Sequence, residues 1–128
     1  MTQRTGLKIL LIDDEGEFAS TLAERLNLRG FSTSVALDGE SALARIKAEP
    51  FDLALLDVML PGMHGIEVLR RIRECRPELP VILLTGRAGA KDGIEGMKQG
   101  AKGYLTKPVD LSELLALFAT VHPGGANA

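Results

Sequence analysis

The chain has 128 residues, a formal net charge of −2 and one cysteine, and 45% of its residues are hydrophobic. This length predicts one domain that folds without a disulfide or structural metal, and the ordinary composition excludes a chain that is disordered throughout. With 15 Lys and Arg against 17 Asp and Glu, the chain lacks the basic excess of a nucleic-acid module, so we expect no direct binding to nucleic acid.

Neither a targeting signal nor a membrane segment is visible in the sequence. The first residues, MTQRTG, lack the apolar stretch of a secretory peptide. Apolar runs reach six residues at most, far short of the roughly 20 that span a bilayer. The lone Cys75 cannot form an internal disulfide, which suits a reducing compartment. We therefore expect a cytoplasmic protein that does not insert into a membrane.

Five short apolar runs alternate with segments of helical periodicity. The expected strands are 7–12, 31–35, 51–56, 81–84 and 103–105. The first, third and fourth are almost continuously apolar, which is typical of parallel strands covered on both faces. The expected helical stripes are Phe18, Leu22 and Leu26; Ala42, Leu43 and Ile46; Ile66, Leu69 and Ile72; Ile94 and Met97; and Leu111, Leu114, Phe118 and Val121. Gly30, Pro50 and Pro77 mark the ends of the first three helices, and Asp110 is the expected N-cap of the last.

A strand followed by a helix, five times over, predicts an α/β fold with a parallel sheet. Five strands are too few for an eight-stranded barrel. We therefore expect an open, doubly wound, five-stranded parallel sheet in the order 2-1-3-4-5 with five helices, a flavodoxin-like fold. We expect this domain to span residues 7–121, after a short N-terminal extension (1–6) and before a disordered tail (122–128).

Polar residues stand at the ends of four of the expected strands. In open parallel sheets the ligand crevice lies at the carboxyl ends of the strands, where the strand order reverses, here between strands 1 and 3. The residues at these strand ends are Asp13, Asp14 and Glu15, then Asp57, Thr85 and Lys107. We expect them to meet at this crevice.

The residue types in this set favour phosphoryl transfer. Three aspartates in one crevice repel each other and stay ionised only beside a compensating cation. Oxygen ligands of this kind point to Mg²⁺. Lys107 adds a fixed positive charge and Thr85 a hydroxyl donor, which together supply the positioning and charge neutralisation that phosphoryl transfer needs. A carboxylate in the middle of such a site can act as the nucleophile and form an acyl phosphate.

Four sequence elements carry a resemblance to the response-regulator receiver domain of two-component signal transduction. They are the Asp13-Asp14 pair, LLDVMLPGMHG around Asp57, LTG with Thr85, and GYLTKP with Tyr104, Lys107 and Pro108. The resemblance covers about residues 7–121. It implies a receiver fold and a phosphorylation-dependent switch that catalyses its own phosphorylation and dephosphorylation. Such a switch turns over no external substrate and is not an enzyme in the ordinary sense.

The resemblance implies a phosphoacceptor and a metal site. Asp57 would take a phosphoryl group from a phosphohistidine of a sensor histidine kinase or a histidine phosphotransferase. Asp14 and Asp57 would ligate Mg²⁺ through their side chains, Asp13 mainly through water, and Met59 through its backbone carbonyl.

The resemblance also implies how the signal leaves the site. Lys107 would pair with the phosphoryl oxygens, and the Lys107–Pro108 bond would be cis. Thr85 and Tyr104 would act as switch residues that remodel the face made by the fourth helix, fifth strand and fifth helix. This face would control an unknown output domain or protein, in a monomer or a phosphorylation-dependent dimer. Because the length leaves no room for an output domain, we expect the effect to pass through a partner or through sequence beyond these residues.

Two features depart from the commonest family pattern. His64 stands where the loop often has aspartate, and we expect no loss of chemistry from that. Met59 and Arg87, which lie two residues beyond Asp57 and Thr85, flank the phosphoryl group in this family and vary among its members. Neither suits the orientation of an attacking water, so we hypothesise slow autodephosphorylation.

Three other functions fit parts of the pattern. A Mg²⁺-dependent aspartate-nucleophile phosphatase of the haloacid-dehalogenase type needs a general acid/base carboxylate two residues after the nucleophile, where this chain has Met59. A flavodoxin-like cofactor binder needs a first loop that cradles phosphate, but residues 13–17 read DDEGE. A pseudo-receiver, an interaction module that is never phosphorylated, is disfavoured by the intact acidic set.

Glycines and arginines in two helical segments also need an interpretation. Interior glycines cost roughly 0.5–1 kcal/mol each relative to alanine. The fourth segment contains Gly89, Gly93, Gly96 and Gly100. They make it either a mobile switch element or a closely packed helix. In the third segment we interpret the basic run as a solvated face balanced by Glu67 and Glu74; the run comprises Arg70, Arg71, Arg73 and Arg76.

Overall fold

The computed structural model describes residues 6–86 and 90–121. The expected tail (122–128), Arg87 and all but the last residue of the expected extension (1–6) lie outside the described residues. The strands are β1 (Lys8–Ile12), β2 (Ser32–Ala36), β3 (Leu53–Asp57), β4 (Val81–Thr85) and β5 (Gly103–Thr106). The helices are α1 (Gly16–Asn27), α2 (Gly39–Ala48), α3 (Gly65–Cys75), α4 (Ala90–Lys98) and α5 (Leu111–Val121).

The five strands form one parallel sheet in the order β2-β1-β3-β4-β5. This confirms the predicted order, and the predicted strand boundaries differ by at most two residues. Ile12 pairs with Leu56, and Asp57 pairs with Leu84. This register brings the carboxyl ends of β1, β3 and β4 to one edge of the sheet. The polar residues predicted to form the site lie at these strand ends.

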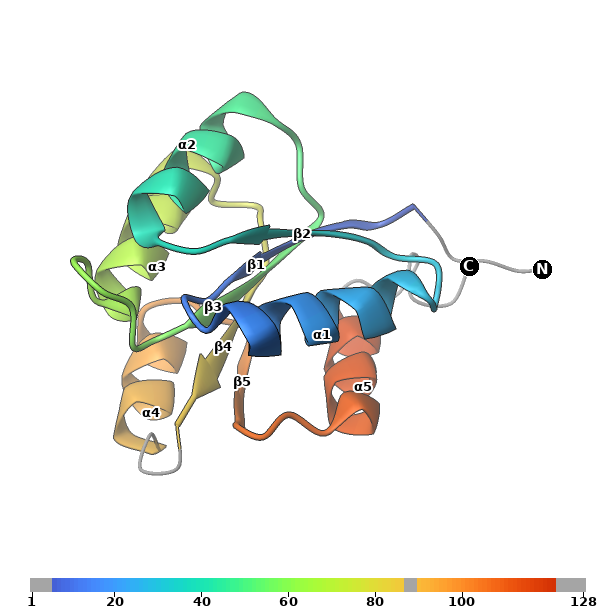
Figure 1. The fold of residues 1–128 in the computed structure, drawn as a ribbon. Helices are drawn as coiled ribbons and strands as arrows, with labels where there is room; N and C mark the ends of the chain where they lie inside the picture. The colour runs from blue at the N-terminus through green and yellow to red at the C-terminus, as the bar shows by residue number, and fades with distance from the viewer. Residues whose placement is uncertain (1–5, 87–89, 122–128) are drawn as a thin grey trace.

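Helices cover both faces of the sheet. In Figure 1, α1 and α5 lie on one side and α2, α3 and α4 on the other. Successive residues of β1 alternate between the two layers: Leu10 and Ile12 pack with α2 and α3, and Ile9 and Leu11 pack with α1 and α5. All four are fully buried. Burial on both faces explains why the central strands read as continuous apolar runs.

The predicted fourth helix is present, but its predicted apolar stripe does not form the core. Ile94 and Met97 are 54% and 43% exposed. The buried face instead carries Gly93 and Gly96, and a β-carbon at either position would collide with Tyr104 or Leu83, respectively. Close packing therefore accounts for these two glycines, because only a residue without a side chain lets α4 lie this near to β4 and β5.

Helix ends agree with the turn residues in the sequence. Gly30 adopts a φ of 94° just beyond α1, a conformation that favours glycine. The carboxylate of Asp110 accepts a hydrogen bond from the Glu113 amide at the start of α5, which confirms the predicted N-cap. At the start of α3, His64 Nδ1 accepts from the amide of Ile66. The histidine thus provides the acceptor that an aspartate would provide at an N-cap.

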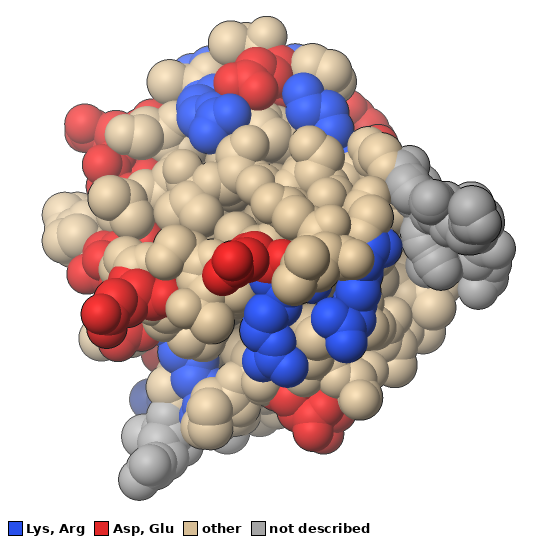
Figure 2. Space-filling model, turned by 45° about the vertical axis from the view of Figure 1, so that its right-hand side comes forward, with Lys and Arg blue, Asp and Glu red and all other residues tan. Residues whose placement is uncertain are grey.

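The charged surface mixes both signs. On α3, Arg70 forms ion pairs with Glu67 and Glu74, and Arg71 forms one with Glu67. These pairs support the interpretation of the basic run as a solvated, balanced face. Figure 2 shows the same mixture on one side of the molecule, where basic side chains lie beside acidic ones. Among the helices of the described residues, none is long and apolar enough to cross a membrane.

Candidate functional site

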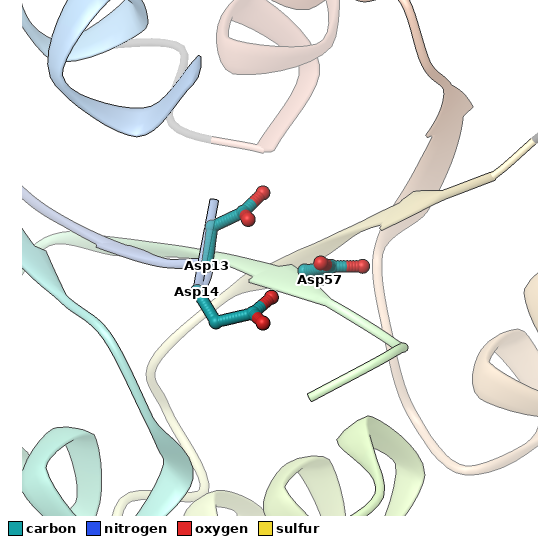
Figure 3. A group of neighbouring side chains, drawn as sticks. All are labelled: Asp13, Asp14 and Asp57. Carbon is teal, nitrogen blue, oxygen red and sulfur yellow. The ribbon is translucent and has the colours of Figure 1, made fainter. Parts of the chain in front are cut away.

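Three aspartates meet at the carboxyl ends of β1 and β3. Asp13 and Asp14 directly follow β1, and Asp57 is the last residue of β3. One carboxylate oxygen from each lies within 4.8 Å of the others, and Figure 3 shows the three side chains gathered beyond these strand ends. Asp13 and Asp57 are buried, whereas Asp14 is exposed. The cluster lies where the strand order reverses, as the sequence predicted.

Main-chain amides fix the two buried carboxylates. The amide of Asp13 donates to the carbonyl of Ala36 at 3.0 Å, which anchors the end of β1 beside β2. Asp13 Oδ1 accepts from the Glu15 amide at 2.9 Å, and Asp57 Oδ1 accepts from the Met59 amide at 3.0 Å. Each carboxylate is thus held in a defined orientation by the amide two residues later.

Lys107 enters the cluster from the end of β5. Its Nζ lies 2.8 Å from Asp13 Oδ2, 2.5 Å from Glu15 Oε1 and 3.3 Å from Asp57 Oδ2. Its amide donates to the carbonyl of Thr85 at 2.8 Å, which ties the base of the side chain to β4. The Lys107–Pro108 peptide bond is cis, in agreement with the expectation from the family resemblance.

Burial and neighbouring charges raise the pKa of both Asp57 and Lys107, which disfavours the charged form of the aspartate and favours that of the lysine. Desolvation raises the pKa of Asp57, and the charge of Asp13 adds to this, although the Met59 amide and Lys107 act against it. Desolvation disfavours the charged form of Lys107, but its close contacts with the Asp13 and Glu15 carboxylates prevail and raise its pKa. The lysine is therefore firmly positive, while the ionised Asp57 carboxylate is held in an unfavourable environment.

The donor set fits a hard divalent cation. Only one lysine faces the carboxylates of Asp13, Asp14, Glu15 and Asp57, so the described residues leave the cluster with excess negative charge. Asp13 Oδ2 is buried and has its ion pair with Lys107, but no well-directed hydrogen bond from the described residues. Oxygen ligands with uncompensated charge, two of them buried and one exposed, match the preference of Mg²⁺.

Thr85 ends β4, and Tyr104 lies on the neighbouring strand β5. Thr85 is fully buried, and its hydroxyl donates to the carbonyl of Leu105 at 3.5 Å, the long limit of a hydrogen bond. Tyr104 is half-buried, packs against the core and covers the backbone of Gly93 on α4. Of the two predicted switch residues, Thr85 therefore contacts β5 and Tyr104 contacts α4.

The loop after Asp57 approaches the site closely. Gly65 donates its amide to the carbonyl of Val58, and a β-carbon at position 65 would stand 2.7 Å from the carbonyl oxygen of Asp57. Met59 contributes its amide to the Asp57 carboxylate, while its side chain is 63% exposed. This side chain is therefore open to solvent two residues after Asp57.

Two contacts of Lys107 were not predicted from the sequence. The sequence pattern identifies Glu15 only as the last acid of the strand-end triplet and predicts Phe18 as part of a core stripe. Phe18 is half-buried and packs against the core, as its stripe predicts, and its ring centroid also lies 4.5 Å from Lys107 Nζ. The position of Glu15 beside two site aspartates could have indicated its contact with Lys107. No spacing rule connects Phe18 with a lysine 89 residues away.

The sheet has the order 2-1-3-4-5, and its aspartates and one lysine cluster where the strand order reverses. This is the arrangement of a signalling receiver domain. The model of the response regulator receiver domain family matches residues 9–119. The chain belongs to this family, and it is a receiver domain of the two-component type. Receiver domains act as phosphoacceptor switches and bind Mg²⁺ at an acidic pocket, and the type implies a kinase partner.

Relatives with known names include longer regulators. The chain is 41% identical over 112 residues to the transcriptional regulatory protein TcrA of Mycobacterium tuberculosis, covering 88% of this chain and 44% of that protein. It is 46% identical over 114 residues to the transcriptional regulatory protein CpxR of Klebsiella pneumoniae, covering 89% of this chain and 48% of that protein. The chain thus spans about half the length of the curated relatives it matches.

Solved structures of receiver domains share the fold over nearly the whole chain. The receiver domain of the Francisella response regulator 1452 aligns with a TM-score of 0.85 and 32% identity, covering 93% of this chain and 98% of that one. A CheY-like receiver domain protein from Methanospirillum hungatei aligns with a TM-score of 0.87 and 29% identity, covering 96% and 98%. These alignments confirm the predicted receiver fold.

Proposed function

We propose that Asp57 is the phosphoacceptor and that residues 7–121 form the receiver unit of a phosphorylation-dependent switch. The observation that carries the proposal is the juxtaposition of three carboxylates with Lys107, whose Nζ lies 3.3 Å from Asp57 Oδ2. Asp57 ends a fully buried strand, and its carboxylate lies close to both other aspartates and to Lys107.

The donor in this proposal is a phosphohistidine of a sensor histidine kinase or a histidine phosphotransferase. A carboxylate oxygen of Asp57 attacks phosphorus, and the bond between phosphorus and the histidine nitrogen breaks. Its electron pair returns to the imidazole ring, and an acyl phosphate forms on Asp57. Lys107 then donates hydrogen bonds to the phosphoryl oxygens and offsets their charge, a role that its raised pKa supports.

Magnesium would be held by the side chains of Asp14 and Asp57, by Asp13 mainly through water, and by the backbone carbonyl of Met59. When bound, the ion supplies charge neutralisation and orientation for phosphoryl transfer. The excess negative charge of the cluster supports this assignment, since the carboxylates repel each other and desolvation already penalises the ionised Asp57.

The signal leaves the site through Thr85 and Tyr104 in this proposal. The Thr85 hydroxyl turns from the Leu105 carbonyl toward the phosphoryl group, and the Tyr104 ring moves inward into the space beside it. Because the ring covers Gly93, its movement alters the packing of α4 against β5. The face formed by α4, β5 and α5 then controls an output domain or protein, and the receiver stays a monomer or forms a phosphorylation-dependent dimer.

Incubation with acetyl phosphate and Mg²⁺, followed by intact-mass measurement, tests the proposal. We expect one added phosphoryl group on the wild type, none in EDTA, and none on Asp57→Ala. A label that survives Asp57→Ala contradicts the role of Asp57. Failure of the wild type to take up any label, with no binding of beryllium fluoride either, would instead support a pseudo-receiver. Turnover of a generic phosphomonoester would support the phosphatase alternative.

A further inference from the structure

Lys107 is held on the α1 side of the acidic cluster. Among its carboxylate partners, Glu15 is the nearest at 2.5 Å and Asp57 the farthest at 3.3 Å. The ring of Phe18, also on α1, lies 4.5 Å from the ammonium nitrogen. The ammonium therefore sits nearer to the start of α1 than to the carboxylate on which the phosphoryl group is proposed to form.

The side chain of Glu15 binds Lys107 instead of capping its own helix. Glu15 is the N-cap residue of α1, yet its carboxylate makes no capping hydrogen bond. The side chains that ordinarily accept from an amide two or three residues later are those of Ser, Thr, Asp and Asn, and the longer Glu15 side chain makes no such bond. Here the carboxylate turns to a partner 92 residues away in the chain. The contact is therefore not a by-product of how the helix begins.

Glu15 is the contact that Lys107 can release at the lowest cost. The Asp13 carboxylate is fully buried and fixed by the Glu15 amide, so it cannot turn away to solvent. The Phe18 ring covers the ammonium on the α1 side. The Glu15 side chain is 61% exposed and can return to water, and exposed ion pairs of this kind contribute little stability.

We propose that Glu15 is a positioning residue that competes with the phosphoryl group for Lys107, an inference that rests on the proposed phosphorylation of Asp57. Its carboxylate draws the ammonium toward α1 and must release it before Lys107 can bind the phosphoryl oxygens. The same carboxylate adds negative charge at a crevice that receives an anionic donor. Glu15 therefore slows the loading of Asp57, and neutralising it speeds loading.

The substitution Glu15→Gln tests this directly, because it keeps the shape of the side chain and removes its charge. We expect the rate constant for phosphorylation by acetyl phosphate at saturating Mg²⁺ to rise about two- to fivefold, the range that corresponds to an exposed ion pair. The advantage should shrink in 1 M NaCl, where the screening length is about 3 Å. Glu17→Gln is the matched control, since Glu17 is exposed, lies on the same turn and forms no ion pair within the described residues.

A second measurement follows the lysine in the metal-free protein. Nitrogen-15 NMR of the Lys107 ammonium should show faster hydrogen exchange in Glu15→Gln than in the wild type and in Glu17→Gln. The inference is overturned if Glu15→Gln loads no faster than the wild type, if Glu17→Gln accelerates loading equally, or if the ammonium signal is unchanged. A wild type that takes up no phosphoryl group contradicts the proposed function instead, and the ammonium signal then decides whether Glu15 holds Lys107.

Discussion

Gly65 lies against the backbone of Asp57, so closely that a β-carbon at position 65 would stand 2.7 Å from the Asp57 carbonyl oxygen. The first turn of α3 therefore rests directly on the end of β3. This contact sets the course of the loop that carries Met59, whose amide in turn binds the Asp57 carboxylate. The position of α3 and the orientation of the Asp57 carboxylate are thus linked through one glycine.

Substitution of Gly65 by alanine should destabilise the fold by about 1–3 kcal/mol, the usual cost of overpacking, because the obstacle is backbone and cannot move aside. Urea unfolding followed by circular dichroism measures the change. Gly16→Ala is the control: a β-carbon there meets nothing within 4 Å, so its stability should be unchanged or slightly higher. Equal stability of the two variants would show that the close approach at Gly65 is relieved without cost.

Replacement of Asp57 by asparagine should stabilise the metal-free protein at neutral pH. The folded state raises the pKa of this carboxyl chiefly through desolvation, so folding penalises its ionised form. The penalty is present above the folded pKa and disappears as the pH falls below the unfolded value near 3.8. Thermal unfolding in EDTA should therefore show an advantage for Asp57→Asn at pH 7 that vanishes in acid. A less stable Asp57→Asn protein at pH 7 would contradict the assigned environment.

His64 should contribute to the stability of α3 as its N-cap. Loss of the acceptor that binds the Ile66 amide, in His64→Ala, should cost about 1 kcal/mol in the free energy of unfolding. His64→Asp restores an acceptor at the same position and should recover at least the wild-type value. If His64→Ala unfolds at the same urea concentration as His64→Asp, the histidine does not act as a cap.

Met59 should make the acyl phosphate long-lived. Its side chain is 63% exposed and cannot orient a water for attack on phosphorus, whereas an amide can. We expect phospho-Asp57 to decay faster in Met59→Asn than in the wild type, measured by loss of the phosphorylated mass after removal of the donor. Met59→Leu, which keeps an apolar side chain, should decay at the wild-type rate. Equal decay in all three proteins would refute the role of this position.

Much of the architecture could be predicted because it depends on local chemistry. Continuous apolar runs such as 81–84 indicate strands buried on both faces, and the strand-end positions of Asp13 and Asp57 follow from the topology. The buried face of α4 could not be predicted in this way, since Ile94 and Met97 have the right spacing but face outward. Close backbone packing at Gly93 leaves no apolar side chain to mark the buried face, so hydrophobicity indicates the wrong side of the helix, and the helical spacing of the glycines alone does not distinguish close packing from mobility.

The site was predictable as a set of residues but not as a set of contacts. The acids and Lys107 could be placed together because strand ends converge in a parallel sheet. The distances from Lys107 to Glu15 and Phe18 depend on how the side chain leaves β5 and where α1 begins. Neither is encoded in a spacing along the chain, and both emerged only in three dimensions.

The identity of the phosphorylated residue tests the central claim most directly. After phosphorylation with acetyl phosphate and Mg²⁺, reduction of the acyl phosphate with borohydride and peptide mass spectrometry would locate the modified side chain. We predict a single modification, at Asp57 in the segment LLDVMLPGMHG, that depends on Mg²⁺. In Lys107→Ala this modification should be absent or strongly reduced. Modification at Asp13 or Asp14, or equal labelling of Asp57 without Mg²⁺, would contradict the account.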